Sequence, residues 1–187
     1  MTAREAYAAV VSTLTAAGVE SPQAEAWLLL GQLTGLSRAR LLTDSHQLDG
    51  AQERQLGEWL ARRSLREPLQ LILGNCHFYG LELICEPGVL IPRPETERLV
   101  EIALGLVAHT PSPRTLDVGP GTAAVALALA SERPDAAVLA SDISERAVDL
   151  ARRNTRALGL TVEVVQAPLL ESEAVKGFAA GAHLIVS

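Results

Sequence analysis

The sequence is poor in cysteine, with only Cys76 and Cys85 among its 187 residues. Two thiols cannot build a disulfide framework, and this pair matches no metal-ligand spacing. His77 and His183 have no cysteine or carboxylate partners at ligand spacing, so we expect both to be structural and no metal to be bound. Free cysteine is usually buried, which favours reduced structural thiols over a redox-active pair.

The sequence also lacks long apolar runs and an excess of positive charge. No stretch approaches the ~20 apolar residues that span a bilayer, and the opening MTAREAYAAVV lacks the apolar core of a signal peptide. We therefore expect a cytoplasmic protein with no membrane partner. Lysine and arginine total 16 against 22 acidic residues, a net charge of −6, which argues against general binding to nucleic acid. The 48% of hydrophobic residues suffice for a real core.

Residues 1–67 are expected to form a small bundle of about four helices. Thr2 and Glu5 have the spacing of a capping box at the start of the first helix. Ser21 stands before a proline and is expected to cap a second helix, because serine caps helices and proline suits the first helical position. Asp49 is expected to cap a longer helix near the end of this region.

Residues 68–92 are expected to form a β-hairpin linker. Phe78 and Tyr79 are followed by Gly80 and then by the alternating apolar residues Leu81, Leu83 and Cys85, a pattern that suggests a hairpin. After the linker, Pro94 is expected to open a helix whose apolar residues recur at helical spacing. The expected buried face consists of Leu99, Ile102, Ala103, Leu106 and Val107.

The region from residue 93 to residue 187 then alternates strand and helix. The strands are expected at TLDVG, AVLASD, VEVVQ and HLIVS, and the helices at TAAVALALASE and SERAVDLARRNTRALG. Strands that alternate with helices form parallel sheets with right-handed crossovers. The predicted fold class is therefore α/β, with a doubly wound parallel sheet preceded by a helical bundle.

The segment LDVGPGTAAVALALA combines a strand, a glycine-rich turn and a helix. Gly119 and Gly121 let the backbone approach a ligand, and the helix behind them presents free N–H groups to it. Asp142 ends the next strand, where a carboxylate can accept both hydroxyls of an adenosine ribose. The sequence thus predicts a nucleotide-like ligand at the carboxyl ends of the first strands.

Two ligands fit this arrangement. Gly119, Gly121 and Ala124 satisfy the permissive form of the dinucleotide motif G-x-G-x-x-A, which alone is a weak signal. Asp117 favours S-adenosylmethionine instead, because a carboxylate repels a pyrophosphate but attracts the ammonium and sulfonium groups of the methyl donor. A third possibility is a structural role in which Asp117 only binds amides of the loop.

Several stretches together resemble the HemK/PrmC family, the glutamine-N5 methyltransferases of peptide-chain release factors. They are IPRPETE (91–97), the glycine loop with its flanks, and HLIVS, and the resemblance covers roughly residues 67–187. It implies a Rossmann-like methyltransferase sheet of which 93–187 is the first part, and a substrate-recognition role for the bundle. It also implies S-adenosylmethionine as cofactor and a release factor as protein substrate in translation termination, methylated in its Gly-Gly-Gln loop.

The resemblance assigns residues to a cofactor pocket and to its wall. The cofactor-binding residues are Asp117, Gly119, Pro120, Gly121, Thr122, Ala123, Asp142 and Leu169. The wall consists of Pro92, Arg93, Pro94 and Thr96, a segment that on its residues alone fits an ordinary helix start. Three positions depart from the family pattern, and we expect them to weaken cofactor binding. Ala123 replaces a third glycine, Pro120 replaces threonine or serine, and Pro168 replaces an aspartate that meets adenine.

In the family, Asn-Pro-Pro-Tyr follows the strand that HLIVS resembles and holds the substrate amide in line with the methyl group. The chain stops at Ser187, so we expect it to lack the catalytic motif and to be inactive as written. We also expect the edge at HLIVS to promote self-association. Two alternatives stay open: a methyltransferase acting on another protein or on a nucleic-acid amino group, and a non-enzymatic Rossmann-type binding module.

Overall fold

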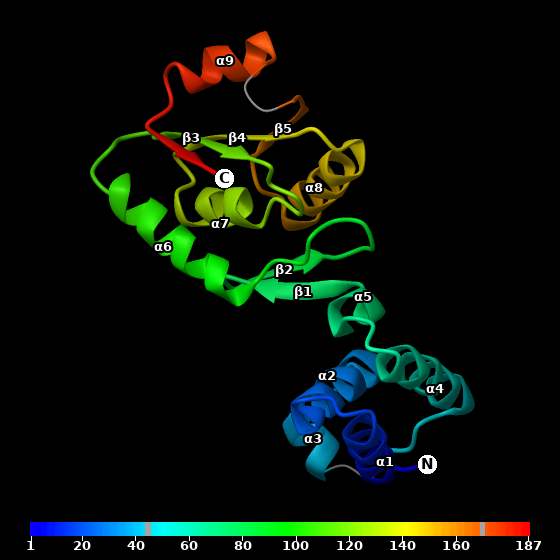
Figure 1. The fold of residues 1–187 in the computed structure, drawn as a ribbon. Coiled ribbons are helices and arrows are strands. Elements are labelled where there is room, and N and C mark those ends of the chain that lie inside the picture. The colour runs from blue at the N-terminus through cyan, green and yellow to red at the C-terminus, as the bar shows by residue number, and fades with distance from the viewer. Residues whose placement is uncertain (44–45, 169–170) are drawn as a thin grey trace. The chain divides into compact units, whose positions relative to one another are not determined.

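A computed structural model describes residues 1–43, 46–168 and 171–187 of the chain. It contains two compact units, Met1–Leu73 and Gly74–Ser187, each with buried apolar residues of its own (Figure 1). The hairpin belongs to the second unit, and its separation as a linker over 68–92 stays a prediction. Within the described ranges, no helix is both long and apolar enough to cross a membrane.

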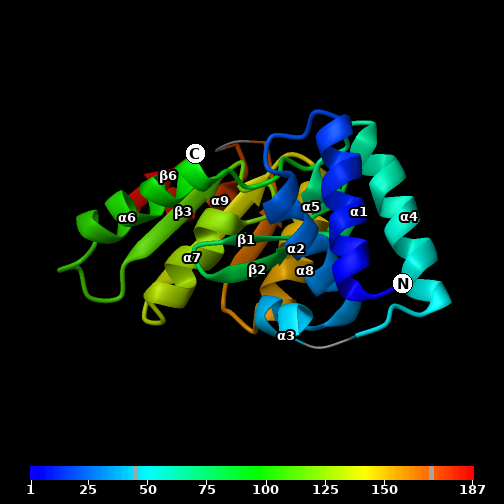
Figure 2. The ribbon, with the colours of Figure 1, turned by 90° about the horizontal axis from the view of Figure 1, so that it is seen from below.

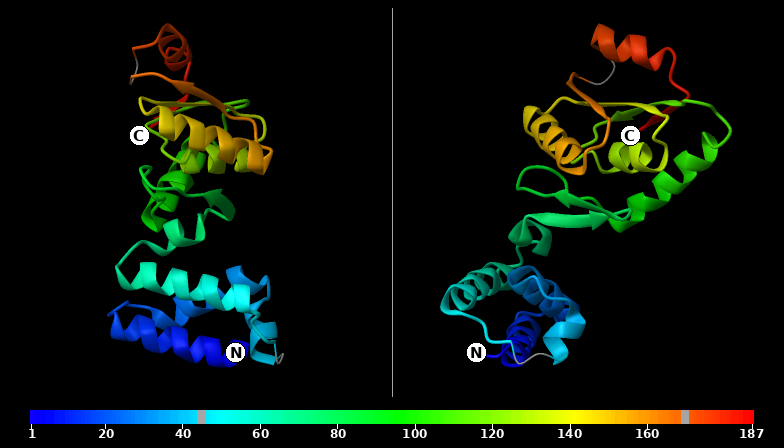
Figure 3. Two further views of the ribbon diagram at one scale, coloured as in Figure 1. Left: turned by 90° about the vertical axis from the view of Figure 1, so that its right-hand side faces the viewer. Right: turned by 180° about the vertical axis from the view of Figure 1, so that it is seen from behind.

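The first unit consists of helices packed side by side (Figure 3). These are α1 (Ala3–Ala16), α2 (Pro22–Thr34), α3 (Arg38–Thr43), α4 (Gly50–Ser64) and α5 (Leu69–Leu73). Val10 and Leu14 of α1 meet Leu29 and Leu30 of α2 in an apolar core from which water is excluded. The expected helical bundle is therefore confirmed, and α5 extends it beyond residue 67.

Two of the three expected helix caps are confirmed. Thr2 and Glu5 form the capping box of α1, and the Asp49 carboxylate accepts the N–H groups of Ala51 and Gln52 at the start of α4. Ser21 is the exception, because its side chain makes no capping hydrogen bond within the described structure. The second helix instead begins on the proline that follows, whose ring already fixes a helical φ.

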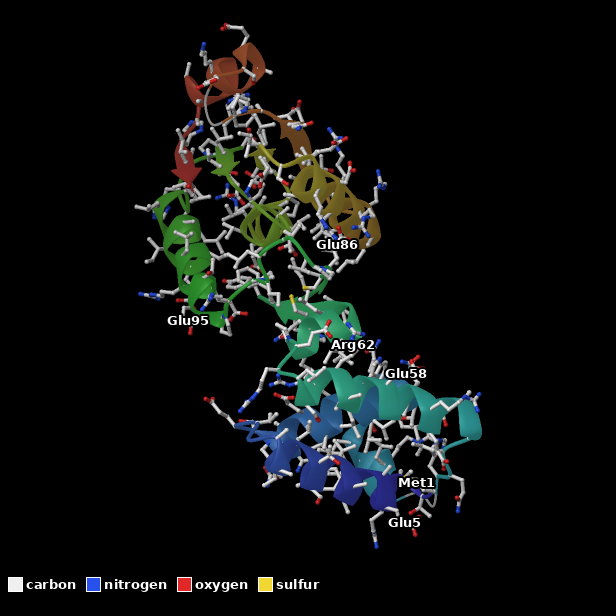
Figure 4. The ribbon with its side chains drawn as sticks, turned by 45° about the vertical axis from the view of Figure 1, so that its right-hand side comes forward. Met1, Glu5, Glu58, Arg62, Glu86 and Glu95 are labelled. Atoms are coloured by element: carbon white, nitrogen blue, oxygen red, sulfur yellow. The ribbon has the colours of Figure 1, made fainter. Side chains whose placement is uncertain are left out.

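One ion pair joins α2 to α4. Arg63 Nε and Nη2 donate to the two carboxylate oxygens of Glu25 at 2.7 and 2.8 Å, and both side chains are only 15% exposed. Glu25→Gln leaves the guanidinium poorly paired and is expected to lower the free energy of unfolding by about 2–3 kcal/mol. Urea unfolding measures this, with Glu58→Gln on the exposed side of α4 as a matched control (Figure 4). Equal losses in the two variants would contradict a structural role for the pair.

The second unit begins with the expected hairpin. Strands β1 (Asn75–Phe78) and β2 (Leu81–Ile84) pair antiparallel. The two residues between them, Tyr79 and Gly80, have φ values of +49° and +76°. Left-handed conformations at both central positions are typical of the tight turn whose twist matches that of paired strands.

The hairpin brings the two cysteines together, which their spacing did not predict. Cys76 and Cys85 are buried and free, and each thiol affects the ionisation of the other. Interaction with Cys85 lowers the pKa of Cys76, whereas interaction with Cys76 and burial raise the pKa of Cys85. The buried, unoxidised thiols agree with the structural role that we expected.

The helix after the hairpin begins as a short 3-10 turn, η1 (Pro94–Thr96), and continues as α6 (Glu97–Leu106). Its buried residues are Val100, Ala103 and, just past its end, Val107. The expected face was wrong in part, because Ile102 and Leu106 are 49% and 70% exposed. The apolar residues cover a wider arc of the helix than the stripe that packs on its neighbours.

The sheet of the second unit is parallel, in the order β5-β4-β3-β6. Its strands are β3 (Arg114–Val118), β4 (Ala137–Asp142), β5 (Glu163–Gln166) and β6 (Leu184–Val186). Helices α7 (Ala124–Glu132) and α8 (Glu145–Leu158) lie against one face, and α9 (Glu173–Ala179) lies against the other (Figures 1 and 3). The predicted α/β fold is thus confirmed, whereas α9 was not predicted.

Each end of β3 is fixed by its neighbours. At its start, the His183 imidazole Nδ1 accepts the N–H of Arg114 at 3.0 Å, so this histidine is structural as expected. Helix α7 lies against this strand (Figure 2), and its residues from Ala124 to Ala130 are all buried. The carboxyl end of β3 leads into the glycine loop.

Candidate functional site

A cavity of about 420 Å³ lies at the carboxyl end of β3. Its floor is the glycine loop, and its wall is the segment that leads into α6. The lining residues are Leu90, Ile91, Pro92, Arg93, Glu95, Thr96, Leu99, Asp117, Gly119, Pro120, Gly121, Thr122, Ala124, Val125 and Ser187. More than half of these residues had been assigned from the sequence either to cofactor binding or to the wall of the pocket. The apolar members were missed, although all of them lie within or beside the two motifs. They are Leu90, Ile91, Leu99 and Val125.

The glycine loop turns sharply from β3 into α7. Gly119 and Gly121 have φ values of +75° and +55°, which residues with a Cβ rarely adopt. Ala123 also has a positive φ, +65°. The turn is closed by the Gly119 N–H, which donates to the Ser141 carbonyl at 2.8 Å, and by the Ala123 N–H, which donates to the Pro120 carbonyl at 2.8 Å.

Ala123 departs from the expected site in an informative way. It is fully buried and, among the described residues, is absent from those that line the cavity. Its methyl group therefore takes no space from the ligand, and its effect is strain in the backbone. A left-handed conformation costs a residue with a Cβ roughly 1–2 kcal/mol, which explains why glycine suits this position.

Ala123→Gly is therefore expected to preserve the free energy of unfolding or raise it by up to about 1 kcal/mol. Relief of the left-handed strain offsets the ~0.4–1 kcal/mol by which glycine stabilises the unfolded chain. Ala128→Gly is the matched control, because Ala128 is equally buried but lies inside α7, where glycine should cost about 1 kcal/mol. Thermal unfolding of the two variants checks the difference, and equal losses would contradict strain at Ala123.

Asp117 is a buried carboxyl group that faces this cavity. It is 5% exposed, and its Oδ2 accepts the N–H of Ala126 in α7 at 3.1 Å. Burial raises the pKa of Asp117 to about 7, the nearby charge of Asp142 adds to the increase, and the hydrogen bond from Ala126 opposes it. The carboxyl group is thus poised to ionise near neutral pH when a cation binds beside it.

Asp142 lies on the other side of the glycine loop. Its Oδ2 accepts the Gly121 N–H at 3.2 Å and its Oδ1 accepts the Ser144 N–H at 2.9 Å, so it joins the loop to the start of α8. Among the described residues it does not line the cavity itself. The next residue, Ile143, is 70% exposed and was not singled out from the sequence.

The wall of the cavity comes from IPRPETE. Pro92, Arg93 and Thr96 line the cavity as expected, whereas Pro94 opens η1 with its ring exposed and is absent from the described lining. Glu95 was missed, although it stands beside the cavity at the N-terminal end of α6 (Figure 4). Two further expected positions lie past β5: Pro168 is exposed, and Leu169 lies outside the described residues.

Glu97, the last residue of the same motif, fastens the wall to the hairpin. One of its carboxylate oxygens accepts the N–H of Tyr79 at 2.7 Å. Tyr79 lies at the tip of the hairpin, where its N–H is not needed to pair the two strands. This hydrogen bond therefore holds the start of α6 against the hairpin and fixes one side of the wall.

Two family models match the chain. The PrmC N-terminal domain matches residues 5–74, and the methyltransferase small domain matches residues 100–180. The first match corresponds to the helical unit and the second to most of the parallel sheet with its helices.

Several curated relatives are named release factor glutamine methyltransferase. The protein of Deinococcus radiodurans is 39% identical over 188 residues, which cover 100% of this chain and 66% of the relative. The protein of Escherichia coli is 42% identical over 162 residues, covering 86% of this chain and 58% of the relative. The protein of Burkholderia pseudomallei is 46% identical over 135 residues, which cover 72% of this chain and 47% of the relative. The chain thus spans about half to two thirds of the length of these relatives.

Among solved structures, the chain is similar to a tRNA (uracil-54, C5)-methyltransferase of Pyrococcus abyssi in complex with S-adenosyl-L-homocysteine. The TM-score is 0.44 at 21% identity, over 50% of this chain and 23% of that one. A second similar structure is the N-terminal domain of human METTL16 in complex with the same compound, with a TM-score of 0.42 at 17% identity. That match covers 66% of this chain and 46% of the other.

Proposed function

The chain belongs to the PrmC family of release factor glutamine methyltransferases, and we propose that its glycine-loop cavity binds S-adenosylmethionine for the methylation of a glutamine side chain. The observation that carries this proposal is the placement of Asp117, a buried carboxyl group, beside the open backbone of Gly119 and Gly121. A carboxylate there suits a cationic ligand and disfavours a pyrophosphate.

The residues present fit this cofactor. Asp117 would hold the ammonium group of its amino-acid end, and the glycine loop leaves room for that end to lie against the backbone. Asp142 would accept hydrogen bonds from the ribose, since a carboxylate oxygen has a second lone pair besides the one that meets an amide. Ile143 offers an exposed apolar surface for the adenine ring. Bound here, S-adenosylmethionine supplies a methyl group carried on a positively charged sulfur.

The wall of the cavity is proposed to position the substrate. The side-chain nitrogen of glutamine is a poor nucleophile, because its lone pair is delocalised into the carbonyl group. Methyl transfer to it therefore depends on holding nitrogen, methyl carbon and sulfur in line, which can lower a barrier by up to ~7–11 kcal/mol. Pro92, Arg93 and Thr96 face the same cavity as Asp117 and so border the space in which the two reactants would meet.

We propose a cytoplasmic location and peptide-chain release factors as the protein substrate, with the glutamine of their Gly-Gly-Gln loop as the methylated residue. The names of the curated relatives support this assignment. The net charge of −6 favours a protein over a nucleic acid as the substrate. The expected inactivity of the 187-residue chain and its self-association stay predictions.

Calorimetric titration with S-adenosylhomocysteine tests the cofactor site, with NAD as the control ligand. Binding of the first compound alone supports the proposal, whereas binding of NAD alone would overturn it in favour of a dinucleotide site. The substrate is tested with a release factor and with a variant factor whose Gly-Gly-Gln glutamine is alanine. A release factor that does not bind the chain, or that binds it no better than the alanine variant, would contradict the proposed substrate.

A further inference from the structure

Asn154 of α8 is a polar side chain in an apolar place. It is completely buried, on the same face of the helix as Ala147, Leu150 and Ala151. A buried side-chain amide without partners costs several kcal/mol, so such a residue is expected to have specific hydrogen bonds. Neither the composition of this segment nor the spacing of its apolar residues indicates from the sequence that Asn154 is buried and hydrogen-bonded.

The Asn154 amide bonds to two separate segments. Its Oδ1 accepts the N–H of Ile84 in β2 at 2.7 Å, and its Nδ2 donates to the carbonyl of the same residue at 3.3 Å. The side chain thus pairs with Ile84 as a neighbouring strand would. Its Nδ2 also donates to the carbonyl of Thr122 in the glycine loop at 3.0 Å. Both amide hydrogens are therefore used, each on a different part of the unit.

These bonds span the layers of the second unit. The hairpin lies on the side of α7 and α8 that faces away from the sheet (Figures 1 and 3). Asn154 reaches from α8 to the hairpin and to the loop in front of α7. Glu86 makes a second link between the hairpin and α8 through ion pairs with Arg146 and Arg153 (Figure 4), but the guanidinium partners are 56% and 40% exposed and water screens them.

The Thr122 carbonyl is the sensitive point of the loop. It belongs to the peptide group that precedes Ala123, the residue held at φ +65° without being glycine. A strained conformation persists only where surrounding groups fix it. The Asn154 hydrogen bond fixes this peptide group, while Thr122 and Gly121 line the cavity and Asn154 is not among its described lining residues.

We propose that Asn154 is a positioning residue, which holds the glycine loop in its ligand-binding conformation and couples that loop to the hairpin. This inference rests on the proposed cofactor site. Without the amide, only the hydrogen bond from the Ala123 N–H to the Pro120 carbonyl still holds the peptide group between Thr122 and Ala123. The group can then rotate toward a less strained conformation, and the loop loses the shape that admits the cofactor.

The test compares Asn154→Ala with Val148→Ala, which removes buried apolar contacts from the same helix and no side-chain hydrogen bond. Hydrogen exchange is measured on both proteins, and S-adenosylhomocysteine affinity is measured by calorimetry at a temperature where circular dichroism shows both folded. We expect Asn154→Ala to weaken binding at least tenfold and to speed exchange of the Ala123 amide at least tenfold. Val148→Ala should change either quantity by less than about threefold. If Asn154→Ala does not fold, Asn154→Asp replaces it, because a carboxyl group has at most one donor hydrogen and cannot bond both carbonyls.

The outcomes separate this inference from the proposed function. If the unaltered protein binds S-adenosylhomocysteine and the Asn154 variant binds it equally well with unchanged exchange, the positioning role is overturned and the cofactor site stands. If the unaltered protein does not bind, the cofactor site fails. The exchange of Ala123 still decides then whether Asn154 fixes the loop, and exchange equal in the two variants would overturn that role.

Discussion

Asp117→Asn is expected to stabilise the cofactor-free protein at pH 8 while it weakens cofactor binding. The asparagine can still accept the N–H of Ala126 through its side-chain oxygen, and it carries no charge into a site that is 5% exposed. In the natural protein, burial raises the pKa of Asp117 to about 7, so that above this pH the folded state holds a charge that is more stable in the unfolded chain.

The pH dependence of this gain follows from the direction of the shift. Well below pH 3.8, the ordinary pKa of an aspartate, Asp117 is protonated in both states and causes no loss of stability. Between pH 4 and 7 the unfolded state ionises and the folded state does not, and the natural protein loses up to about 4 kcal/mol through this one group. The variant should therefore match the natural protein near pH 4 and exceed it by roughly 2–4 kcal/mol at pH 8.

Urea unfolding at pH 4, 6 and 8 measures the gain, and Asp135→Asn is the control. The pKa of Asp135 is lowered to about 2 by its hydrogen bonds from Arg133 and from the Ser112 N–H, so the loss of its carboxylate should destabilise the protein at neutral pH.

The expected weakening of cofactor binding is measured separately. Affinity for S-adenosylhomocysteine should fall by about tenfold per pH unit below 7 in the natural protein and should be weak and pH-independent in Asp117→Asn. A variant that binds as tightly as the natural protein would leave Asp117 with only a structural role.

Asp142→Ala is expected to reduce cofactor affinity by at least a hundredfold. The carboxylate is proposed to bind the ribose, and it also holds the Gly121 and Ser144 N–H groups at the two ends of the loop region. Hydrogen bonds to a charged group contribute about 1.5–3 kcal/mol each, so the loss of two to the ligand amounts to about 3 kcal/mol or more. The released loop adds to this loss.

Asp149→Ala provides the control. Asp149 is an exposed aspartate of α8, the helix that begins just after Asp142, so the variant removes a nearby carboxylate that is not proposed to meet the ligand. Its affinity should stay within about twofold of that of the natural protein. Calorimetry with S-adenosylhomocysteine measures both variants. Similar affinities for Asp142→Ala and the natural protein would place the ribose elsewhere and would reopen the identity of the ligand.

The sequence predicted those features that depend on local chemistry. Thr2 with Glu5 and Asp49 showed helix starts, the alternation after Gly80 showed a hairpin, and the alternation of strand and helix after residue 93 showed a parallel sheet. Each depends on the conformational preferences of a few adjacent residues, which a single sequence contains. The cavity side of the glycine loop was predictable for the same reason.

The features that were missed depend on contacts between distant segments. Asn154 meets β2 at a separation of 70 residues, and nothing near it in the chain indicates a partner. The exposure of Ile102 and Leu106 depends on how narrow the contact between α6 and its neighbours is. Ala123 looked like an obstacle to the ligand, because the side of the loop on which its methyl group lies is decided by backbone angles that the sequence does not display.

The pairing of β3 also has a consequence for protein synthesis. Its two neighbours in the sheet are β4, which follows closely, and β6, which begins only at Leu184. Ribosomes add about 5–20 residues per second, so one side of β3 waits for several seconds after it has been made. During that interval the nascent chain presents unpaired N–H and C=O groups between Thr115 and Asp117, a stretch that chaperones are well placed to shield.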